Sequence, residues 1–398
     1  MRAGAPIAVL LTPVLPLPGG SGRALRAWDW LLELSRDHAV HVLVAAPTSG
    51  LPPLPPHYPA AKVRALGDVT RSTARWRRLT GLLFPPAALI SRRFVLDWQV
   101  PAAGFAAAAG EGVAWSAVDR IVVFRLYLHD LGLCLSRLAA TAGMELDLDD
   151  LESQTRFSVA AALLRGRRYR AAARMFCSAL QYRLVERAAS QHYRRLYLAA
   201  PEDCRLLPRR ASGGITCRPN RIRMPAEIPP PPAAGDLRLL FVGTLDYPPN
   251  EEAARDLALR IIPALRTRLH RPWRLVVVGS HASPALERIL RHTAGLEFMA
   301  GGVDLSGLYA ASHVALVPVR AGGGTKFKTL EGFAHRRPVV STRHGVRGLA
   351  ARAGAHYLPA ETAAEFAEAI HRLATDRPLA ERIADAGWRL CQTGYSAP

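Results

Sequence analysis

Short apolar runs alternate with glycine-rich loops and amphipathic segments along much of the chain. In the first half this pattern predicts a helix at Arg23–Arg36 and strands at Ile7–Leu11, Val40–Ala45, Ile121–Phe124 and Leu196–Ala199. A buried strand, a glycine loop, a helix and another buried strand are typical of a parallel, doubly wound sheet. The basic segment Ser153–Arg195 is predicted to be helical.

A proline-rich segment from Ile228 to Gly235 indicates a stiff linker. After it, the alternation of apolar strands and amphipathic helices begins again. The predicted strands are Leu237–Val242, Arg274–Val278, Leu296–Met299, Val314–Val317 and Val339–Ser341. The predicted helices are Glu251–Leu269, Ala285–Arg291, Leu305–Ala311, Lys326–Ala334 and a final region from Ala363. We therefore predict an α/β protein with two Rossmann-like, doubly wound parallel-sheet domains that face an interdomain cleft. The expected domains are residues 1–212 and 213–398, with the last helix returning to the N-terminal domain.

The length and composition agree with this organisation. A chain of 398 residues suits two hydrophobic cores better than one. No apolar stretch approaches the roughly 18 residues needed to span a bilayer, and prolines interrupt the apolar N-terminus, which we interpret as a buried strand and not as a signal peptide. The five cysteines form no CxxC pair, which argues against a zinc site and a disulfide framework. We expect a cytoplasmic protein.

The net charge of +20 comes almost entirely from arginine. Arginines concentrate in the segments 71–78, 165–174 and 194–223. Such patches attract polyanions, but no nucleic-acid-binding motif accompanies them, so we expect no specific nucleic-acid partner. The segment Arg165–Arg174 has two interpretations: a solvated helix face, or peripheral contact with an anionic membrane at its inner face.

Lysine is rare in this chain, and two of the three lysines lie in one glycine-flanked segment. Lys326 and Lys328 follow three glycines that connect a predicted strand to a predicted helix, and Glu331 comes one turn later. Backbone N–H groups and the positive end of a helix dipole bind phosphate in such a loop. Glu331 then suits neutral hydroxyls such as those of a ribose. The alternative interpretation is a tight turn followed by a solvated Lys–Glu pair.

Residues 237–350 resemble the C-terminal domain of family 4 glycosyltransferases, which have the GT-B fold. The resemblance rests on Phe241-Val-Gly-Thr-Leu-Asp-Tyr-Pro-Pro-Asn250, Val276-Val-Val-Gly279, Ala300-Gly-Gly-Val-Asp304, Val317-Pro318, Gly322-Gly-Gly-Thr-Lys-Phe-Lys-Thr-Leu-Glu331 and Arg337-Pro-Val-Val-Ser-Thr342. The N-terminal half matches more loosely, at Gly19-Gly-Ser-Gly-Arg23, Phe124-Arg-Leu-Tyr127, Asp147-Leu-Asp-Asp-Leu-Glu152 and Arg218-Pro-Asn220.

This resemblance implies a site for a nucleotide-diphosphate sugar, which is a donor substrate, and no separate cofactor. By family analogy Glu331 holds the ribose and Lys326 acts with it in catalysis. The residues that resemblance and loop chemistry assign to donor binding are Gly22, Arg23, Gly243, Thr244, Gly322, Gly323, Gly324, Thr325, Lys326, Lys328 and Glu331.

Two positions depart from the family pattern. Many relatives carry a glutamate that contacts the donor sugar eight positions before the ribose-binding one, and here that residue is Gly323. Many also grip the phosphates with an Arg and a Lys where this chain has Thr244 and Pro249. The second departure leaves Lys326 and Lys328 as the expected phosphate partners. Fixed cations there stabilise the leaving diphosphate without a divalent metal, and the family implies retention of anomeric configuration.

Weaker signals lie in the N-terminal half. His129 follows an apolar strand and is a candidate acid/base or sugar contact, against the alternative of a surface residue in a loop. Arg23 and Arg125 are candidate phosphate or acceptor contacts. Asp147-Leu-Asp149 has the DxD spelling of a metal–diphosphate site, but we favour a cleft-facing loop or a helix N-cap for Asp149 and Asp150. Trp28, Trp30 and Phe327 are expected in the core.

The sequence therefore predicts a hexosyltransferase-type glycosyltransferase that acts on a glycan, lipid-linked or small-molecule acceptor, in polysaccharide or glycoconjugate assembly. Two alternatives stay open. One is an epimerase or hydrolase of the nucleotide sugar with the same fold. The other is a catalytically idle protein that binds nucleotide sugar or glycan, which Gly323 at the family's first glutamate position favours.

Overall fold

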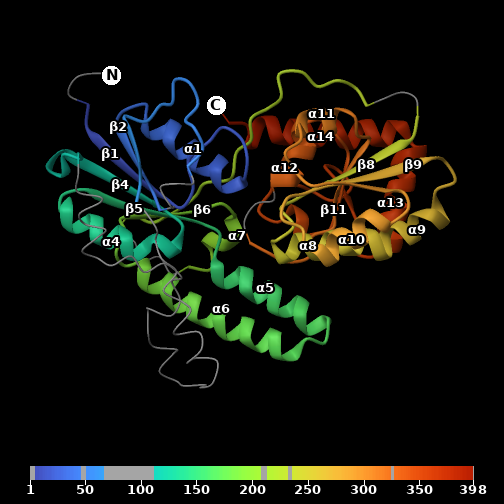
Figure 1. Cartoon of the computed structure of the whole chain (residues 1–398), viewed down its shortest axis with the longest axis horizontal. Coiled ribbons are helices and arrows are strands. Elements are labelled where there is room, and N and C mark those ends of the chain that lie inside the picture. Colours follow the sequence, from blue (N-terminus) through green and yellow to red (C-terminus); the bar gives the residue numbers. More distant parts are fainter. Residues whose placement is uncertain are drawn as a thin grey trace. The chain divides into compact units, whose positions relative to one another are not determined.

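The computed structural model describes residues 5–45, 51–66, 112–207, 213–231, 235–323 and 327–397. The chain divides into two compact units, Met1–Arg218 and Pro219–Pro398 (Figure 1). The division falls between Arg218 and Pro219, whereas the sequence predicted a boundary after residue 212. Each unit is built on one parallel sheet, so the predicted pair of doubly wound α/β domains is confirmed.

The sheet of the N-terminal unit has the order β3-β2-β1-β4-β5-β6-β7 in the described ranges. Its strands are β1 Ile7–Thr12, β2 Ala39–Val44, β3 Lys62–Ala65, β4 Val118–Phe124, β5 Gly143–Asp149, β6 Arg195–Leu198 and β7 Ile215–Cys217. Four of these were predicted, and β3, β5 and β7 were not. β5 is hidden in the sequence because acidic residues interrupt its apolar positions, and only the folded unit supplies arginines that neutralise them.

The two faces of this sheet bury different helices. The helices are α1 Gly22–Leu34, α4 His129–Leu138, α5 Glu152–Arg165, α6 Tyr169–Ala189 and α7 Pro201–Cys204, with short 3₁₀ turns η4 Trp115–Ala117 and η5 Leu126–Leu128. Leu10 of β1 lies in a core with Trp30 of α1, and Leu11 lies in a second core with Leu131 of α4. Adjacent strand residues point to opposite faces, which is why a run of apolar residues suits a sheet covered on both sides.

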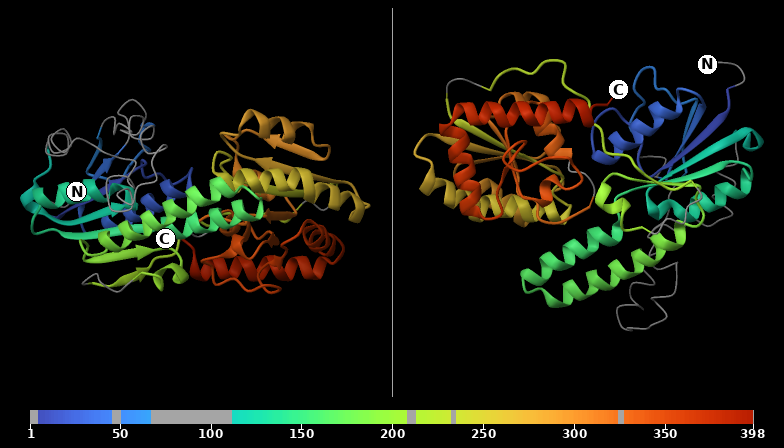
Figure 2. Two further views of the ribbon diagram at one scale, coloured as in Figure 1. Left: turned by 90° about the horizontal axis from the view of Figure 1, so that it is seen from below. Right: turned by 180° about the vertical axis from the view of Figure 1, so that it is seen from behind.

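The basic segment predicted as one helical stretch forms two helices. α5 ends at Arg165 and α6 begins at Tyr169, after Gly166 and after Arg167, which has a φ of 57°. A positive φ is not helical, so the chain turns here. The two helices run antiparallel, side by side, and extend away from the sheet of their unit (Figure 2).

A buried ion pair holds α1 against β5. Arg26 donates from Nε and Nη2 to the two carboxylate oxygens of Asp147, each at 2.8 Å, and the indole of Trp30 donates to the same carboxylate. Arg26 and Asp147 are almost completely buried. Arg218 stacks over the Trp30 ring at 3.8 Å. Removing one partner of such a pair leaves an uncompensated buried charge, at a cost of about 3–5 kcal/mol.

These contacts correct the interpretations of the acidic run. Asp147 is the buried partner of Arg26 and not a side chain directed at a metal–diphosphate group. Asp149 is the last residue of β5 and pairs with Arg125, and Asp150 also accepts a hydrogen bond from Arg125. The N-cap of α5 is Leu151, so the predicted N-cap role of Asp149 and Asp150 is wrong, whereas Asp150 lies in the loop between β5 and α5, as the other alternative predicted. Arg125 follows β4 directly, so its hydrogen bonds to Asp149, Asp150 and Glu152 keep the acidic segment close to that strand.

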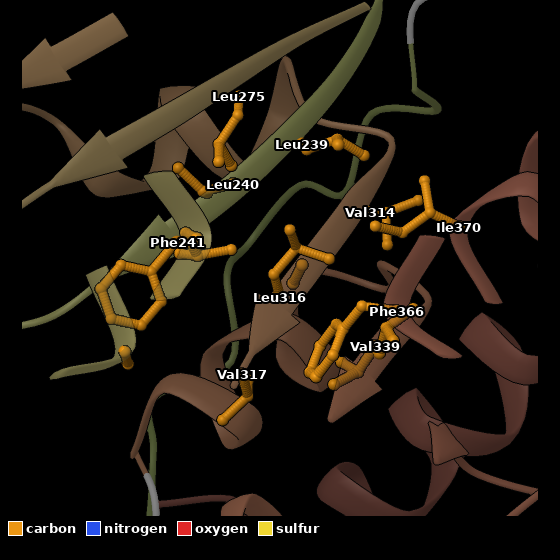
Figure 3. Packing of buried hydrophobic residues seen from close by; sticks show 14 of the residues in the cluster. Leu239, Leu240, Phe241, Leu275, Val314, Leu316, Val317, Val339, Phe366 and Ile370 are labelled. Atoms are coloured by element: carbon orange, nitrogen blue, oxygen red, sulfur yellow. The ribbon is translucent and has the colours of Figure 1, made fainter. Parts of the chain in front are cut away.

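The C-terminal unit has the sheet order β10-β9-β8-β11-β12-β13. Its strands are β8 Leu237–Val242, β9 Trp273–Val278, β10 Leu296–Met299, β11 Val314–Val317, β12 Val339–Ser341 and β13 Leu358–Pro359. Four predicted strands match to the residue, β9 begins one residue earlier, and β13 was not predicted. Leu239, Leu316 and Phe366 belong to the continuous core of this unit (Figure 3).

The helices of this unit are α8 Pro248–Asp256, α9 Ile262–Arg268, α10 Pro284–His292, α11 Leu305–Ala310, α12 Phe327–Ala334, α13 Ala363–Thr375 and α14 Arg377–Gly394, with the 3₁₀ turn η7 His344–Val346. A π-helical segment, η6 Leu257–Ile261, joins α8 to α9. Pro263 lacks an N–H, and the wider turn before it accommodates the missing hydrogen bond. α14 packs against α12 and α13. In the described part of the chain, no helix has both the length and the hydropathy to cross a bilayer.

Candidate functional site

The candidate site lies at the carboxyl edge of the C-terminal sheet, where β8 and β11 are neighbours. The strands that follow β8 extend the sheet in one direction, to β9 and β10, and those that follow β11 extend it in the other. The connections after β8 and β11 therefore leave in opposite directions. Ligands of open α/β sheets bind at such a switch point.

Lys328, in the first turn of α12, links the two connections. Its Nζ donates a hydrogen bond of 2.8 Å to Oδ1 of Asn250 and lies 5.8 Å from the centre of the Phe241 ring. Asn250 in turn donates to the Thr244 carbonyl at 2.9 Å. Burial lowers the pKa of Lys328 to about 8, against the opposing effect of the Glu331 charge. The ammonium is held by a neutral amide in a site that favours additional negative charge.

Glu331 is three residues after Lys328, on the same face of α12. The hydroxyl of Tyr309, on α11, donates to its Oε2 at 3.1 Å. Burial raises the pKa of Glu331, and the Tyr309 hydrogen bond and the Lys328 charge oppose that shift. The Tyr309 ring stacks on His335, with centroids 4.7 Å apart. The carboxylate is thus held in one orientation by a buried, stacked phenol.

Two glycines let the backbone approach closely around these side chains. A Cβ on Gly243 would lie 3.0 Å from the Asn250 side chain. Gly322 has a φ of +107°, and a Cβ there would lie 2.5 Å from the hydroxyl oxygen of Tyr247. The carbonyl of Gly322 is 2.8 Å from Nε2 of His344. Only glycine fits the Gly322 position without strain.

Only some of the remaining predicted donor-binding residues lie in the part of the chain that the structure describes. Thr244 and Gly323 lie in the loops after β8 and β11, close in sequence to Gly243 and Gly322. Gly324, Thr325 and Lys326 lie outside the described residues. Phe327, expected in the core, is half-buried at the start of α12. The structure therefore brings together Lys328, Glu331 and the loop after β8, through Asn250.

Gly22 and Arg23 begin α1 of the other unit. Ser21 caps this helix by accepting a hydrogen bond from the Ala24 N–H at 3.3 Å. Arg23 is exposed, and its charge is one of the influences that lower the pKa of Tyr127, although burial raises that pKa overall. In this sheet β1 and β4 are the neighbours whose connections leave in opposite directions, so Gly22 and Arg23 follow a second switch point.

Arg125 and His129 follow β4 at the same edge. Arg125 is buried, has a φ of 85°, and donates to Asp149, Asp150 and Glu152. His129 is the first residue of α4 and is 3% exposed, with Nδ1 2.9 Å from the Tyr193 hydroxyl. The alternative of a surface histidine in a loop is therefore wrong. Trp30 is fully buried as expected, and Trp28 is half-buried against Tyr58.

Sequence reasoning did not assign Asn250, Tyr309 or His335 to the site. Asn250 ends the motif Phe241–Asn250 that carried the family resemblance, so that motif was the available signal. Tyr309 lies in the short helix α11, and from the sequence alone it is indistinguishable from an ordinary aromatic residue of the core. Its contact with Glu331 spans 22 residues of sequence, and nothing in the local pattern indicates it.

Comparisons with known proteins agree with this geometry. Residues 236–376, which contain β8, β11 and α12, match the family described as glycosyl transferases group 1. Sucrose-phosphate synthase from Thermosynechococcus elongatus superposes with a TM-score of 0.68 at 16% identity, covering 98% of this chain and 95% of the other. The segment 236–376 therefore resembles that glycosyltransferase family, and the chain as a whole has the GT-B fold.

Two further solved structures share this fold. HepE from Anabaena, in complex with UDP and glucose, gives a TM-score of 0.63 at 13% identity, over 98% of this chain and 96% of the other. The α,α-trehalose 6-phosphate synthase from Burkholderia multivorans gives 0.63 at 13% identity, over 98% and 95%. A comparison with curated protein sequences finds no match. The family description names group 1, and membership of family 4 stays a prediction.

The backbone conformation of Gly322 predicts how a substitution there changes the stability of the protein. Gly322→Ala places a side chain at a φ of +107° and against Tyr247. We expect a loss of about 1–3 kcal/mol in the free energy of unfolding, since strained backbone of this kind costs that much. Differential scanning calorimetry should show a melting temperature lower by several degrees.

Gly394→Ala is the matched control in the same unit. Gly394 ends α14, and a Cβ there meets nothing within 4 Å. Its melting temperature should equal that of wild type or rise slightly. Equal stability of the two variants would contradict the close approach at Gly322.

Proposed function

We propose that this protein is a glycosyltransferase that moves a sugar from a nucleotide-diphosphate sugar to a hydroxyl group of a glycan, lipid-linked or small-molecule acceptor. The observation that carries the proposal is the juxtaposition of Lys328 and Glu331 on one face of α12, at the switch point of the sheet. A cation and a carboxylate one turn apart match a diphosphate followed by a ribose. The complex of HepE with UDP and glucose, in a protein of the same fold, supports a donor of this class.

Lys328 is assigned to the diphosphate. Its ammonium is directed by Asn250 and sits over the Phe241 ring, so it reaches an anionic ligand as a point charge already in place. Burial disfavours the charged form in the free protein. A bound diphosphate reverses that preference, because an opposite charge at close range favours the ammonium. Lys326 and the amides of Gly323, Gly324 and Thr325 are assigned to the same phosphates from the sequence.

Glu331 is assigned to the ribose. One of its oxygens accepts from Tyr309, and that hydrogen bond leaves acceptor capacity on a carboxylate with about four lone-pair sites. Neutral hydroxyl donors suit it better than phosphate oxygens do, since like charges repel. Gly243 and Thr244 border the neighbouring Lys328 through Asn250.

The reaction follows from charge. The anomeric C–O bond breaks and its electron pair goes to the leaving diphosphate, while the acceptor oxygen bonds to the anomeric carbon and its proton passes to the departing phosphate. Fixed cations at the diphosphate stabilise the charge that develops, without a divalent metal. Attack from the side of the leaving group retains the anomeric configuration. NMR of the product against the donor tests this step, and an inverted product would refute it.

His129 enters this proposal as a packing residue. It is buried, its Nδ1 is close to the Tyr193 hydroxyl, and its ring lies 5.5 Å from that of His192. Arg23 is exposed at the start of α1 and remains the proposed contact of the N-terminal unit with substrate phosphate or acceptor.

We place the protein in the cytoplasm. Its five free cysteines support this location, since disulfides are rare in a reducing compartment.

The two alternatives have distinct readouts. A nucleotide-sugar hydrolase releases free sugar from the donor alone, and an epimerase returns an altered donor. An idle binding protein binds the nucleotide but turns over no acceptor. Gly323, at the position where many relatives carry a donor-sugar glutamate, is the feature that favours the idle protein.

The role of Glu331 is tested by thermal unfolding with UDP, GDP, CDP and dTDP, each with and without Mg²⁺. A nucleotide at a hundredfold its Kd stabilises the fold by about 2.7 kcal/mol. We expect one nucleotide to raise the melting temperature of wild type without Mg²⁺, and Glu331→Ala to lose most of that shift. Tyr309→Phe should lose part of it, because the carboxylate is no longer held.

Glu252→Ala is the control, since Glu252 is an exposed carboxylate on α8. It should keep the full shift. A shift that requires Mg²⁺ and survives in Glu331→Ala would contradict the ribose assignment and favour a metal site.

Lys328 predicts how donor binding depends on pH. Its pKa in the free protein is about 8, lowered by burial, and a bound diphosphate raises it. Below that pH the ammonium is present and the Kd should be flat with respect to this group. As pH rises above 8, binding must take up a proton, so the Kd should increase by at most about tenfold per pH unit.

Isothermal titration calorimetry from pH 7 to 9.5, in buffers of different ionisation enthalpy, measures both the Kd and the proton uptake. Lys328→Gln should bind more weakly at pH 7 and show neither the rise nor the uptake. If wild type and Lys328→Gln have parallel pH profiles, Lys328 is not the diphosphate partner.

A further inference from the structure

The hairpin of α5 and α6 is held together by small residues and by rings. Ala160 of α5, with Ala172 and Ala179 of α6, is almost completely buried. The Phe157 and Phe176 rings meet edge to face at 5.4 Å, and the guanidinium of Arg156 lies 3.6 Å from the centre of the Tyr182 ring. One face of each helix is thereby used to pair the two helices. Other side chains of α6 stay exposed.

α6 also carries an exposed apolar stripe, defined here as Tyr169, Phe176, Leu180 and Leu184, and Phe176 lies where this stripe borders the face that pairs with α5. Their exposed fractions are 65%, 50%, 36% and 48%. The spacings of seven, four and four residues place them on one side of α6. Leu164, at the end of α5, is also 53% exposed. The hairpin therefore holds five of the nine exposed large hydrophobic residues in the described part of the chain, which is more than scattered surface residues explain.

The stripe is surrounded by positive charge. The segment 152–189 contains eight arginines and two glutamates. Both carboxylates are engaged within the unit, since Glu186 is buried and accepts from Ser153, and Glu152 pairs with Arg125 and Arg156. The exposed charges of the hairpin are arginines: Arg165, Arg167, Arg168, Arg170, Arg174 and Arg187. The surface of the hairpin is thus apolar and cationic at once.

We propose that this hairpin docks the N-terminal unit on an anionic lipid surface, with α6 lying in the plane of the headgroups. An interfacial helix buries its apolar stripe at the boundary of headgroups and acyl chains and directs cations to the lipid phosphates. A nucleic acid would pair with the arginines but leave the stripe in water. A second copy would bring a second cationic hairpin to this one. The proposal rests on the hairpin alone and stands apart from the transfer reaction.

Co-sedimentation of the full chain with vesicles tests this surface. Vesicles of phosphatidylcholine with about one third phosphatidylglycerol should bind the protein, and pure phosphatidylcholine vesicles should bind at least about tenfold more weakly. The double variant Leu180→Ser/Leu184→Ser should weaken binding to the anionic vesicles by about tenfold or more, because each buried leucine contributes to the affinity. Leu259→Ser removes a leucine that is 54% exposed, on the π-helical segment of the other unit, and should bind as wild type does.

The charge is tested with Arg170→Gln/Arg174→Gln, against the control Arg271→Gln at an exposed arginine of the other unit. The hairpin variant should bind anionic vesicles at least about fivefold more weakly, and the control should not change. Circular dichroism and melting temperatures confirm that all variants fold. The proposal is overturned if wild type ignores anionic vesicles. It is also overturned if the leucine variant binds them unchanged, or if wild type forms a dimer in solution that the leucine variant abolishes.

Discussion

Parallel pairing of β8 with β11 brings together the two connections that carry Asn250 and Lys328. Parallel strands end at the same edge of a sheet, and the connections after these two leave in opposite directions. The loops after the two strands therefore diverge above one point, and α8 and α12 begin on either side of it. Asn250 from α8 and Lys328 from α12 meet there at 2.8 Å although 78 residues separate them. Gly322 and Gly243 then keep the backbone close enough for this contact.

Burial gives this edge its electrostatic character. It lowers the pKa of Lys328 and raises the pKa of Glu331, so both groups are pushed toward their neutral forms, and each charge partly offsets the cost of the other. Tyr309 stabilises the Glu331 carboxylate with a hydrogen bond from a ring that is itself held by His335. An anionic ligand beside Lys328 and hydroxyl groups beside Glu331 would stabilise the two charged forms that burial disfavours. The proposed donor has a diphosphate for Lys328 and, next to it, a ribose for Glu331.

The N-terminal sheet has the same strand order around β1 and β4 as the C-terminal sheet has around β8 and β11, but different side chains lie at its carboxyl edge. Arg125 there is enclosed by three carboxylates, and Arg26 is paired with Asp147 below the surface. These charges are matched inside the unit and hold β4, β5 and α1 together. Six exposed arginines of this unit lie instead on the α5–α6 hairpin, beside the apolar stripe. The same sheet topology thus carries a structural ion network here and a candidate binding site in the other unit.

The sequence by itself determined the fold class and the strands that are continuous apolar runs. β8, β10, β11 and β12 match their predicted bounds because apolar side chains must leave water and turn residues end each run. The site was predicted as far as a local motif reached, to Gly322, Lys328 and Glu331. Only the tertiary structure decided that β5 is a strand, that His129 is buried, and that Asn250 and Tyr309 complete the site. Those outcomes depend on partners distant in sequence, and a polar side chain is buried only where folding supplies the group that satisfies it.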